Sequence, residues 1–172
     1  MDYINNLEQW KQVSEFPHYM ISSVGSVMNI KTFRILKPGM NDTTGYLYVN
    51  LYKDGDVSTK RIHRLVAKAF ILNLTNLPCV DHIDRNKLNN HLSNLRWCTR
   101  EENQHNRSKQ KKDTTSVYKG VYFDKKANKW RARIKHNGQR IHLGYFTDEA
   151  DAGRAYDRWA KVHFKEFAHL NF

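Results

Sequence analysis

Between residues 80 and 103 the chain carries several side chains that can bind a metal ion or move a proton. Asp81 and His82 stand side by side directly after the apolar Val80. A neutral imidazole near pH 7 can take a proton from water, and carboxylate and amide oxygens suit a hard divalent cation. Asn94 and Asn103 follow further along and supply such amide oxygens. These residue types predict hydrolysis in which a base activates water and a metal ion stabilises the developing charge.

Short elements must bring these side chains together. Residues 80–82 have the pattern of a strand end, and residues 95–99 alternate as a second strand. The loop between them is rich in Asp and Asn, whose side chains bond their own backbone in turns. Thr99 stands three residues before Glu102, the spacing of a capping box, so we expect a helix to begin directly after it. Strand, loop, strand and helix would form a small finger that gathers Asp81, His82 and Asn103.

This order resembles the HNH nucleases and their ββα-metal finger. The run D-H-x-D-x-N-x-x-N-N…N-L-R-W is similar to that of phage intron homing endonucleases. The resemblance implies that His82 is the general base and that Asn94 braces the loop. It implies that Asp81 and Asn103 bind one Mg²⁺ or Mn²⁺, with Asn103 where His is commoner, and that cleavage leaves 5′-phosphate and 3′-hydroxyl ends.

A structural role is the alternative for each of these residues. Asp81 and His82 would then cap a turn, while the asparagines satisfy loop backbone. We expect that simpler role for Asn86, Asn89 and Asn90.

Charge and composition indicate the class of partner. The 172 residues have a formal net charge of +12 and a pI near 9.7, and all of the excess lies beyond residue 60. Such a balance favours a polyanionic partner. Cys79 and Cys98, the only cysteines, cannot form a paired CxxC zinc site. We see no signal peptide and no apolar run near the ~20 residues of a membrane helix. We therefore expect a cytoplasmic protein, in the host cell if phage-encoded.

The first 60 residues are expected to be mainly β-structure. Residues 10–30 alternate apolar and polar side chains, and their W-K…V…F…Y…I-S…G…V pattern resembles the NUMOD-type modules of homing endonucleases. Residues 45–52 predict a strand with Tyr46, Tyr48, Asn50 and Tyr52 on one face. That face is either a ribbon against DNA or an ordinary sheet edge. Residues 63–71 have helical spacing and would pack behind the finger, with His63 as a DNA-backbone or packing residue.

Residues 118–172 predict three strands followed by a helix. The strands are expected at 118–123, 130–136 and 140–146, with the hairpin signal Asn137-Gly138 between the last two and Thr147 capping the helix. Y-K-G-V, K-W-R-A-R-I, H-L-G-Y-F, A-Y-D and L-N-F resemble the APETALA2/ethylene-response-factor domain. That resemblance implies a sheet face in the major groove of DNA.

Period-two alternation puts Arg131, Arg133 and Lys135 on one face of this sheet. Arg133 and His142 depart from the plant pattern, as does Tyr122, so base preference is not transferred. The expected DNA contacts, including cations of a basic linker, are Lys119, Tyr122, Arg131, Arg133, Lys135, Arg140, His142, Arg107, Lys109, Lys111 and Lys112.

The sequence thus predicts a modular α+β protein. The expected parts are a NUMOD-type module (1–60), an HNH core (61–104), a linker (105–117) and an APETALA2-type domain (118–172). The expected function is site-specific cleavage of double-stranded DNA at a long asymmetric site by a monomer that nicks one strand. The alternative is a DNA-binding regulator with a silent finger. An RNA-binding module is disfavoured because an aromatic stacking platform is missing.

Overall fold

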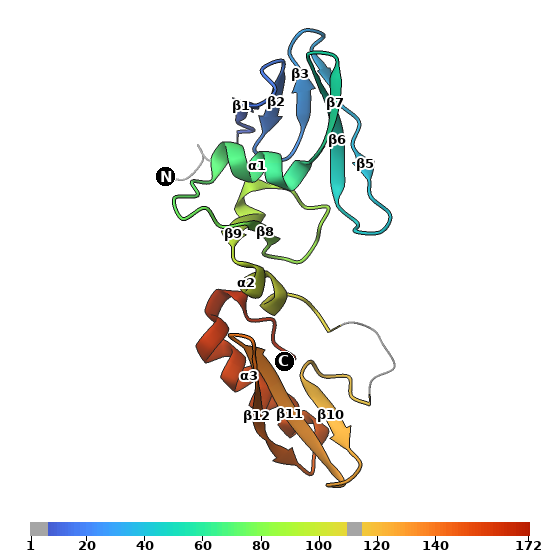
Figure 1. Ribbon diagram of the computed structural model, residues 1–172, viewed down its shortest axis with the longest axis vertical. Helices are drawn as coiled ribbons and strands as arrows, with labels where there is room; N and C mark the ends of the chain where they lie inside the picture. The colour runs from blue at the N-terminus through green and yellow to red at the C-terminus, as the bar shows by residue number, and fades with distance from the viewer. Residues whose placement is uncertain (1–6, 110–114) are drawn as a thin grey trace. The chain divides into compact units, whose positions relative to one another are not determined.

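The computed structural model describes residues 7–109 and 115–172, which form two compact units divided between Cys98 and Thr99 (Figure 1). The expected α+β class is confirmed, because small antiparallel sheets are combined with short helices. Among the described residues, no helix combines the length and apolar character that spanning a bilayer requires.

The N-terminal unit begins with two antiparallel sheets. The first sheet contains β1 (Trp10–Gln12), β2 (Tyr19–Ser22), β3 (Val27–Asn29) and β4 (Arg34–Ile35). The second contains β5 (Gly39–Met40), β6 (Leu47–Lys53) and β7 (Asp56–Arg61). Asp54 and Gly55 join β6 to β7 with φ of 52° and 89°, the left-handed pair that suits a tight hairpin. The sequence analysis did not predict β7, whose side chains are mostly exposed.

The finger follows in the same unit. Helix α1 (Ile62–Phe70) leads to β8 (Cys79–His82), which pairs antiparallel with β9 (Leu95–Cys98) after a 3₁₀ turn at Leu92–Asn94. Leu65 and Val66 on the buried side of α1 pack among residues of the N-terminal strands and of the finger.

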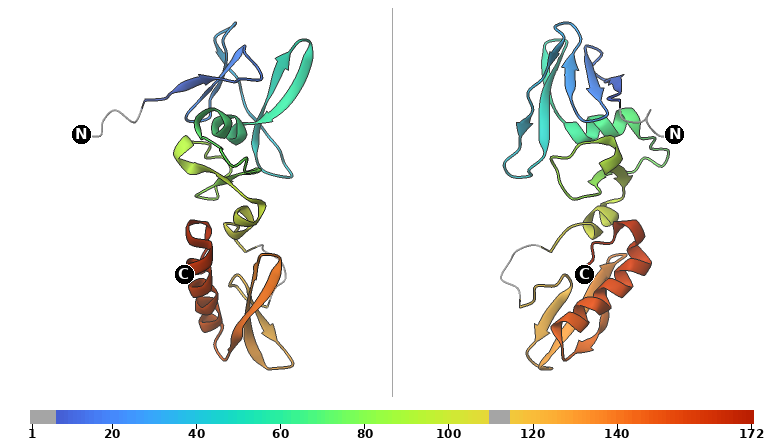
Figure 2. Two further views of the ribbon diagram at one scale, coloured as in Figure 1. Left: turned by 60° about the vertical axis from the view of Figure 1, so that its left-hand side comes forward. Right: turned by 180° about the vertical axis from the view of Figure 1, so that it is seen from behind.

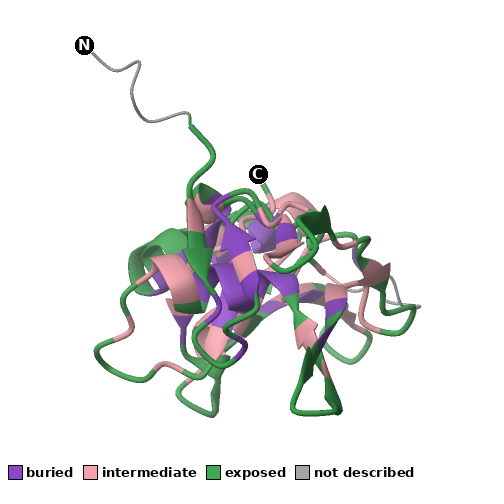
Figure 3. Cartoon of the chain, turned by 90° about the horizontal axis from the view of Figure 1, so that it is seen from above, coloured by how far each residue is buried: buried purple, intermediate pink, exposed green. Residues whose placement is uncertain are grey.

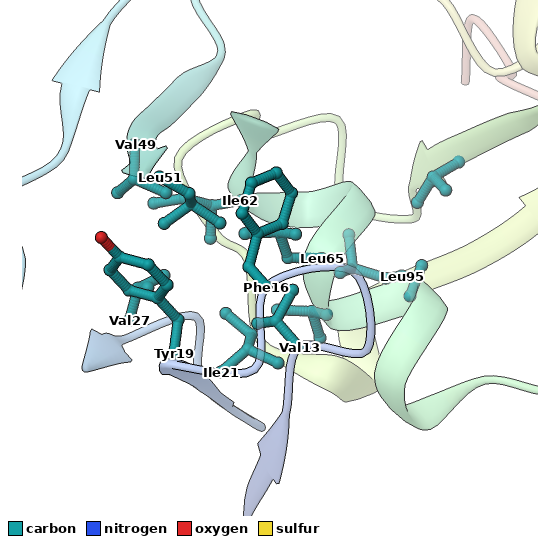
Figure 4. Packing of buried hydrophobic residues seen from close by; sticks show 13 residues of the cluster. Val13, Phe16, Tyr19, Ile21, Val27, Val49, Leu51, Ile62, Leu65 and Leu95 are labelled. Carbon is teal, nitrogen blue, oxygen red and sulfur yellow. The ribbon is translucent and has the colours of Figure 1, made fainter. Parts of the chain in front are cut away.

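One hydrophobic core unites the N-terminal strands with the finger. Ile21, Leu51, Ile62 and Leu95 belong to a single buried cluster (Figure 4). Buried residues gather in the strands and helices, whereas the outer loops are exposed (Figure 3). Full burial of one such aliphatic side chain stabilises the fold by about 1.5–3 kcal/mol. The border expected at residue 60 therefore falls inside one core.

The C-terminal unit begins with the short helix α2 (Arg100–His105). Thr99 Oγ1 accepts from Glu102 N, and Glu102 Oε2 accepts from Thr99 N, so the predicted capping box is present. Next come β10 (Val121–Asp124), β11 (Lys129–His136) and β12 (Gln139–Phe146), which form an antiparallel sheet in that order.

Helix α3 (Glu149–Phe164) covers one face of this sheet (Figure 2). Its N-cap is Asp148, which accepts from Asp151 N at 3.0 Å, so the expectation of a Thr147 cap is wrong by one residue. Ala152, Ala155 and Tyr156 are buried against the sheet, whereas His163 is exposed.

Candidate active site

His82 lies at the end of β8 with only 3% of its surface exposed. Its Nε2 is 3.1 Å from Asn90 Oδ1, and an amide oxygen can only accept, so Nε2 carries the proton. The lone pair of the neutral ring is then on Nδ1. Burial lowers the pKa of His82, although the bond to Asn90 and the charge of Asp81 act in the opposite direction. The ring is therefore neutral at pH 7, the state that a general base requires.

Asp81 precedes the base and is also buried. It lies directly opposite Arg96 in the β8–β9 ladder. Its Oδ2 accepts from Arg96 Nε at 3.0 Å and from Nη2 at 2.9 Å. This two-pronged ion pair compensates the buried carboxylate charge and fixes its orientation beside His82.

Asn94 holds the loop between the two strands. Its Oδ1 accepts from Asp84 N at 2.9 Å, and its Nδ2 donates to Asp84 Oδ1 and to Asn89 O, both at 2.8 Å. Desolvation alone would raise the pKa of Asp84, but hydrogen bonds from Asn89, Asn86 and Asn94 lower it. An ionised Asp84 therefore organises the loop through which the chain leaves His82.

Three side chains contact His82, and of the two from outside the finger only His63 was expected near it, as a DNA-backbone or packing residue. Asn90 is buried and bonds His82, whereas we expected it only to satisfy loop backbone. The ring of His63 lies edge-on to His82 at 5.1 Å. The ring of Tyr46 stacks on His82 at 5.9 Å and lies tilted to His63 at 4.6 Å. His63 Nδ1 is buried without a hydrogen-bond partner among the described residues, and burial lowers the pKa of His63 to about 3. Tyr46 is distant from the finger in the sequence, so no local spacing pattern could have predicted this contact.

The N-terminal hairpin also contacts the loop of the finger. Leu92 N donates to Ser23 O at 2.7 Å. Gly25 has a φ of 94°, and a Cβ there would meet Asn90 Cβ at 2.9 Å. The turn after β2 therefore sets the position of the residue that orients His82.

Asn103, the third expected site residue, lies in the other unit. It is half-buried on α2, where its N–H donates to Thr99 O at 3.1 Å. Only Thr99 separates α2 from β9 along the chain. The structure thus brings Asp81, His82 and Asn94 together within the finger, with Asn103 on the next element.

Comparison with protein families accounts for this arrangement. Residues 60–105 match the model of an HNH endonuclease, residues 8–52 a NUMOD4 motif and residues 116–163 an AP2 domain. The HNH match spans both strands of the finger and α2, including the acid, the base and Asn103. Residues 60–105 are therefore similar to HNH endonucleases.

Several relatives of the chain are named as HNH endonucleases. An uncharacterized HNH endonuclease of Acanthamoeba polyphaga mimivirus is 40% identical over 95 residues, covering 55% of this chain and 28% of its own. The DNA endonuclease I-HmuI of Bacillus phage SP01 is 38% identical over 99 residues (57% and 56%). The H-N-H endonuclease F-TflII of Escherichia phage T5 is 33% identical over 124 residues (71% and 64%). The chain therefore covers less than two thirds of each.

A solved structure of one relative has a similar fold. That structure is of the HNH homing endonuclease I-HmuI and concerns its DNA binding and cleavage. The similarity has a TM-score of 0.53 at 39% identity and covers 57% of this chain and 56% of that one. The resemblance to HNH homing endonucleases is thereby confirmed.

The AP2 domain presents a basic sheet face. Arg131 stands opposite Tyr122 on one side and Tyr145 on the other, and its Nε donates to His142 Nδ1 at 3.1 Å. Arg133 lies over the Tyr122 ring at 4.5 Å. A bulge between Ala132 and Arg133 shifts the pairing of β12. Because a bulge re-aims the following residues, Tyr145 joins this face, which simple alternation from His142 does not predict.

Other expected DNA contacts have different surroundings. Lys119 Nζ donates to His105 O at 2.6 Å and to Arg107 O at 2.7 Å, so its charge serves the fold rather than the sheet face. Lys109 Nζ bonds the carbonyls of Ser116 and Tyr118, and burial lowers its pKa. Arg107, Arg140 and Lys135 have exposed side chains. Lys111 and Lys112 lie outside the described residues.

Proposed function

We propose that the chain is a site-specific DNA endonuclease of the homing type. The observation that carries the proposal is the buried, neutral imidazole of His82, held by Asn90 and adjacent to Asp81 on β8. Nδ1 of this ring would take a proton from the attacking water. The HNH relatives, of which I-HmuI is described as a DNA endonuclease, support the same activity.

One divalent cation would complete the chemistry. Asp81 and Asn103 would hold it through carboxylate and amide oxygens, a donor set that suits Mg²⁺ or Mn²⁺. The bound ion would stabilise charge on the scissile phosphate and on the leaving oxygen. Arg96 fits this role for Asp81, because its ion pair with the carboxylate fixes the orientation of that side chain. Asn94 would act indirectly, by holding the loop that follows the base.

The AP2 domain would supply much of the affinity for double-stranded DNA. Arg131 and Arg133 lie on the sheet face opposite α3, together with Lys135 and aromatic side chains that can cover sugar and base edges. Cations so placed would bind phosphates, and removing one such cation lowers the slope of the salt dependence of binding by roughly one.

The test of this function is cleavage of DNA that spans the flanks of its own gene, with Mg²⁺ or with EDTA. We expect cleavage only with the metal. His82→Ala should abolish cleavage and leave DNA binding within about threefold, because a general base acts mainly on the transition state. His18→Ala, which removes an exposed imidazole, is the matched control. Cleavage by His82→Ala at the rate of the control would refute the assignment of the base.

A DNA-binding regulator with a silent finger is the remaining candidate. It would bind the same DNA without cleaving it under any metal. Replacing Arg131, Arg133 and Lys135 by Gln would weaken DNA binding in a regulator as in a nuclease. A regulator, however, would cleave no DNA before or after the replacement. The intact arrangement of Asp81, His82 and Asn94 favours the enzyme.

A further inference from the structure

A second group of metal-binding side chains lies within the C-terminal unit, outside the residues assigned above to catalysis. Glu101 and His105 stand one turn apart on α2, and His136 ends β11. One possible ligand atom from each lies within 4.8 Å of the other two. Glu101 Oε1 is 3.7 Å from His105 Nε2 and 3.7 Å from His136 Nδ1. Two imidazoles and one carboxylate therefore converge on one point.

These distances suit an ion better than direct hydrogen bonds. A separation of 3.7 Å is too long for a hydrogen bond between nitrogen and oxygen. His136 Nδ1 is buried and has no hydrogen-bond partner among the described residues, which ordinarily costs about 1–3 kcal/mol. Tetrahedral zinc with bonds of about 2.0–2.1 Å separates its ligands by roughly 3.4 Å. The two distances to Glu101 would need to close by only a few tenths of an ångström to match that separation.

Neighbouring groups already orient the three side chains. Glu101 Oε1 accepts from Asn137 N at 2.6 Å. The His105 ring stacks on Phe164 at 3.4 Å with 10° between the planes, and it bonds the backbone of Lys135. Metal ligands are typically held by such outer contacts.

Positively charged side chains near the cluster would repel a metal ion, but one of them, Lys119, already donates hydrogen bonds to the backbone. Lys119 Nζ is bound by the carbonyls of His105 and Arg107. Glu101 supplies a negative charge at the centre of the group. A cavity of about 410 Å³, lined in part by Glu101 and His105, gives an ion and a water ligand access from solvent.

We propose that Glu101, His105 and His136 bind one Zn²⁺ ion, or a similar transition-metal ion, as a structural clip between α2 and β11. Imidazole nitrogen favours zinc over magnesium, and a water molecule would complete the tetrahedron. Helix α2 contains only six residues, too few to be stable alone. The ion would therefore stabilise the helix on which Asn103 is carried.

The test is zinc binding by the full chain with the substitution Asp81→Asn, which weakens the proposed catalytic metal site. After chelator treatment, this protein should bind one Zn²⁺ per chain in calorimetry, and Co²⁺ should give the visible absorption of a tetrahedral site. Adding Glu101→Gln or His136→Gln should weaken zinc binding at least tenfold, because even outer contacts are worth about 10–100-fold. Adding His142→Gln, which removes an imidazole of the same unit outside the cluster, should leave it unchanged.

Circular dichroism without metal shows whether each variant is folded. Equal zinc binding by Glu101→Gln, His136→Gln and the His142→Gln control would overturn the site. So would a parent protein that binds no zinc and gives no tetrahedral cobalt spectrum, because the three side chains would then simply lie next to one another without a shared ion. Neither result bears on DNA cleavage, which is measured separately with Mg²⁺.

Discussion

At the residue scale, Asn90 contacts and orients His82, the proposed general base. Asn90 Oδ1 fixes the tautomer of His82, so Asn90→Asp would keep the shape and add a negative charge at 3.1 Å from Nε2. That charge raises the pKa of His82 because it stabilises the imidazolium ion. The base is active only when neutral, so the acidic limb of the rate–pH profile should move to higher pH. We expect little change in DNA affinity, measured at the same pH values.

An unmoved acidic limb in Asn90→Asp would mean that His82 does not titrate in that limb. Asn86→Asp is the matched control, because Asn86 is an exposed asparagine of the same loop. The rate–pH profile of Asn86→Asp should follow that of the parent protein more closely than the profile of Asn90→Asp does.

The buried His63 predicts a dependence of stability on pH. Its pKa is lowered from 6.5 to about 3 by burial. Between these values the unfolded chain binds a proton that the folded chain excludes, so stability rises with pH across this window and falls as acid is added. The loss approaches about 2 kcal/mol at pH 5. His63→Phe should flatten this dependence in urea unfolding followed from pH 7 to pH 4.5.

The exposed His18 provides the comparison for that experiment. His18→Phe should retain the acid sensitivity of the parent, because its imidazole is exposed in the folded chain. Equal pH dependence of His63→Phe and the parent would show that other groups cause the acid sensitivity.

At the scale of elements, the turn after β2 sets the loop of the finger. Gly25→Ala places a methyl group 2.9 Å from Asn90 Cβ at a φ of 94°. Gly55→Ala has almost the same φ of 89° but meets nothing within 4 Å. Both should lose about 1 kcal/mol through backbone strain, measured by thermal unfolding.

Only Gly25→Ala should also reduce cleavage, since it displaces the residue that holds His82. A similar cleavage rate for both variants would show that the contact with Asn90 does not matter for catalysis.

Local sequence patterns predicted most of the helices and strands but fewer of the contacts between them. The capping box at Thr99 and the alternation of β11 depend on neighbouring residues, so they can be recognised in sequence. β7 was missed because its mostly exposed, polar side chains show little hydrophobic pattern. The bulge at Ala132 and the approach of Gly25 to Asn90 depend on pairing between distant segments. Asp81, His82 and Asn94 were predictable by type and spacing, whereas Tyr46 was not.

At the scale of the whole molecule, one finger should break one strand. The chain has one finger, and therefore one proposed general base (His82) and one proposed catalytic ion beside Asp81. Supercoiled plasmid with the target site should therefore become open circular first, with linear product late or absent. Immediate linear product at low enzyme concentration would instead require two fingers acting together. Plasmid that lacks the site is the control.

The shared core of the N-terminal unit also bears on how such proteins can be recombined. A genetic crossover near residue 60 would combine half of a core with an unrelated half, and side chains such as Leu51 and Ile62 would no longer pack against matched partners. A crossover after Cys98 leaves that core whole and exchanges everything beyond β9. It would also exchange Asn103, so a new C-terminal part would have to bring its own third site residue. Changing the DNA target while keeping the native α2 is therefore best attempted at a junction beyond His105.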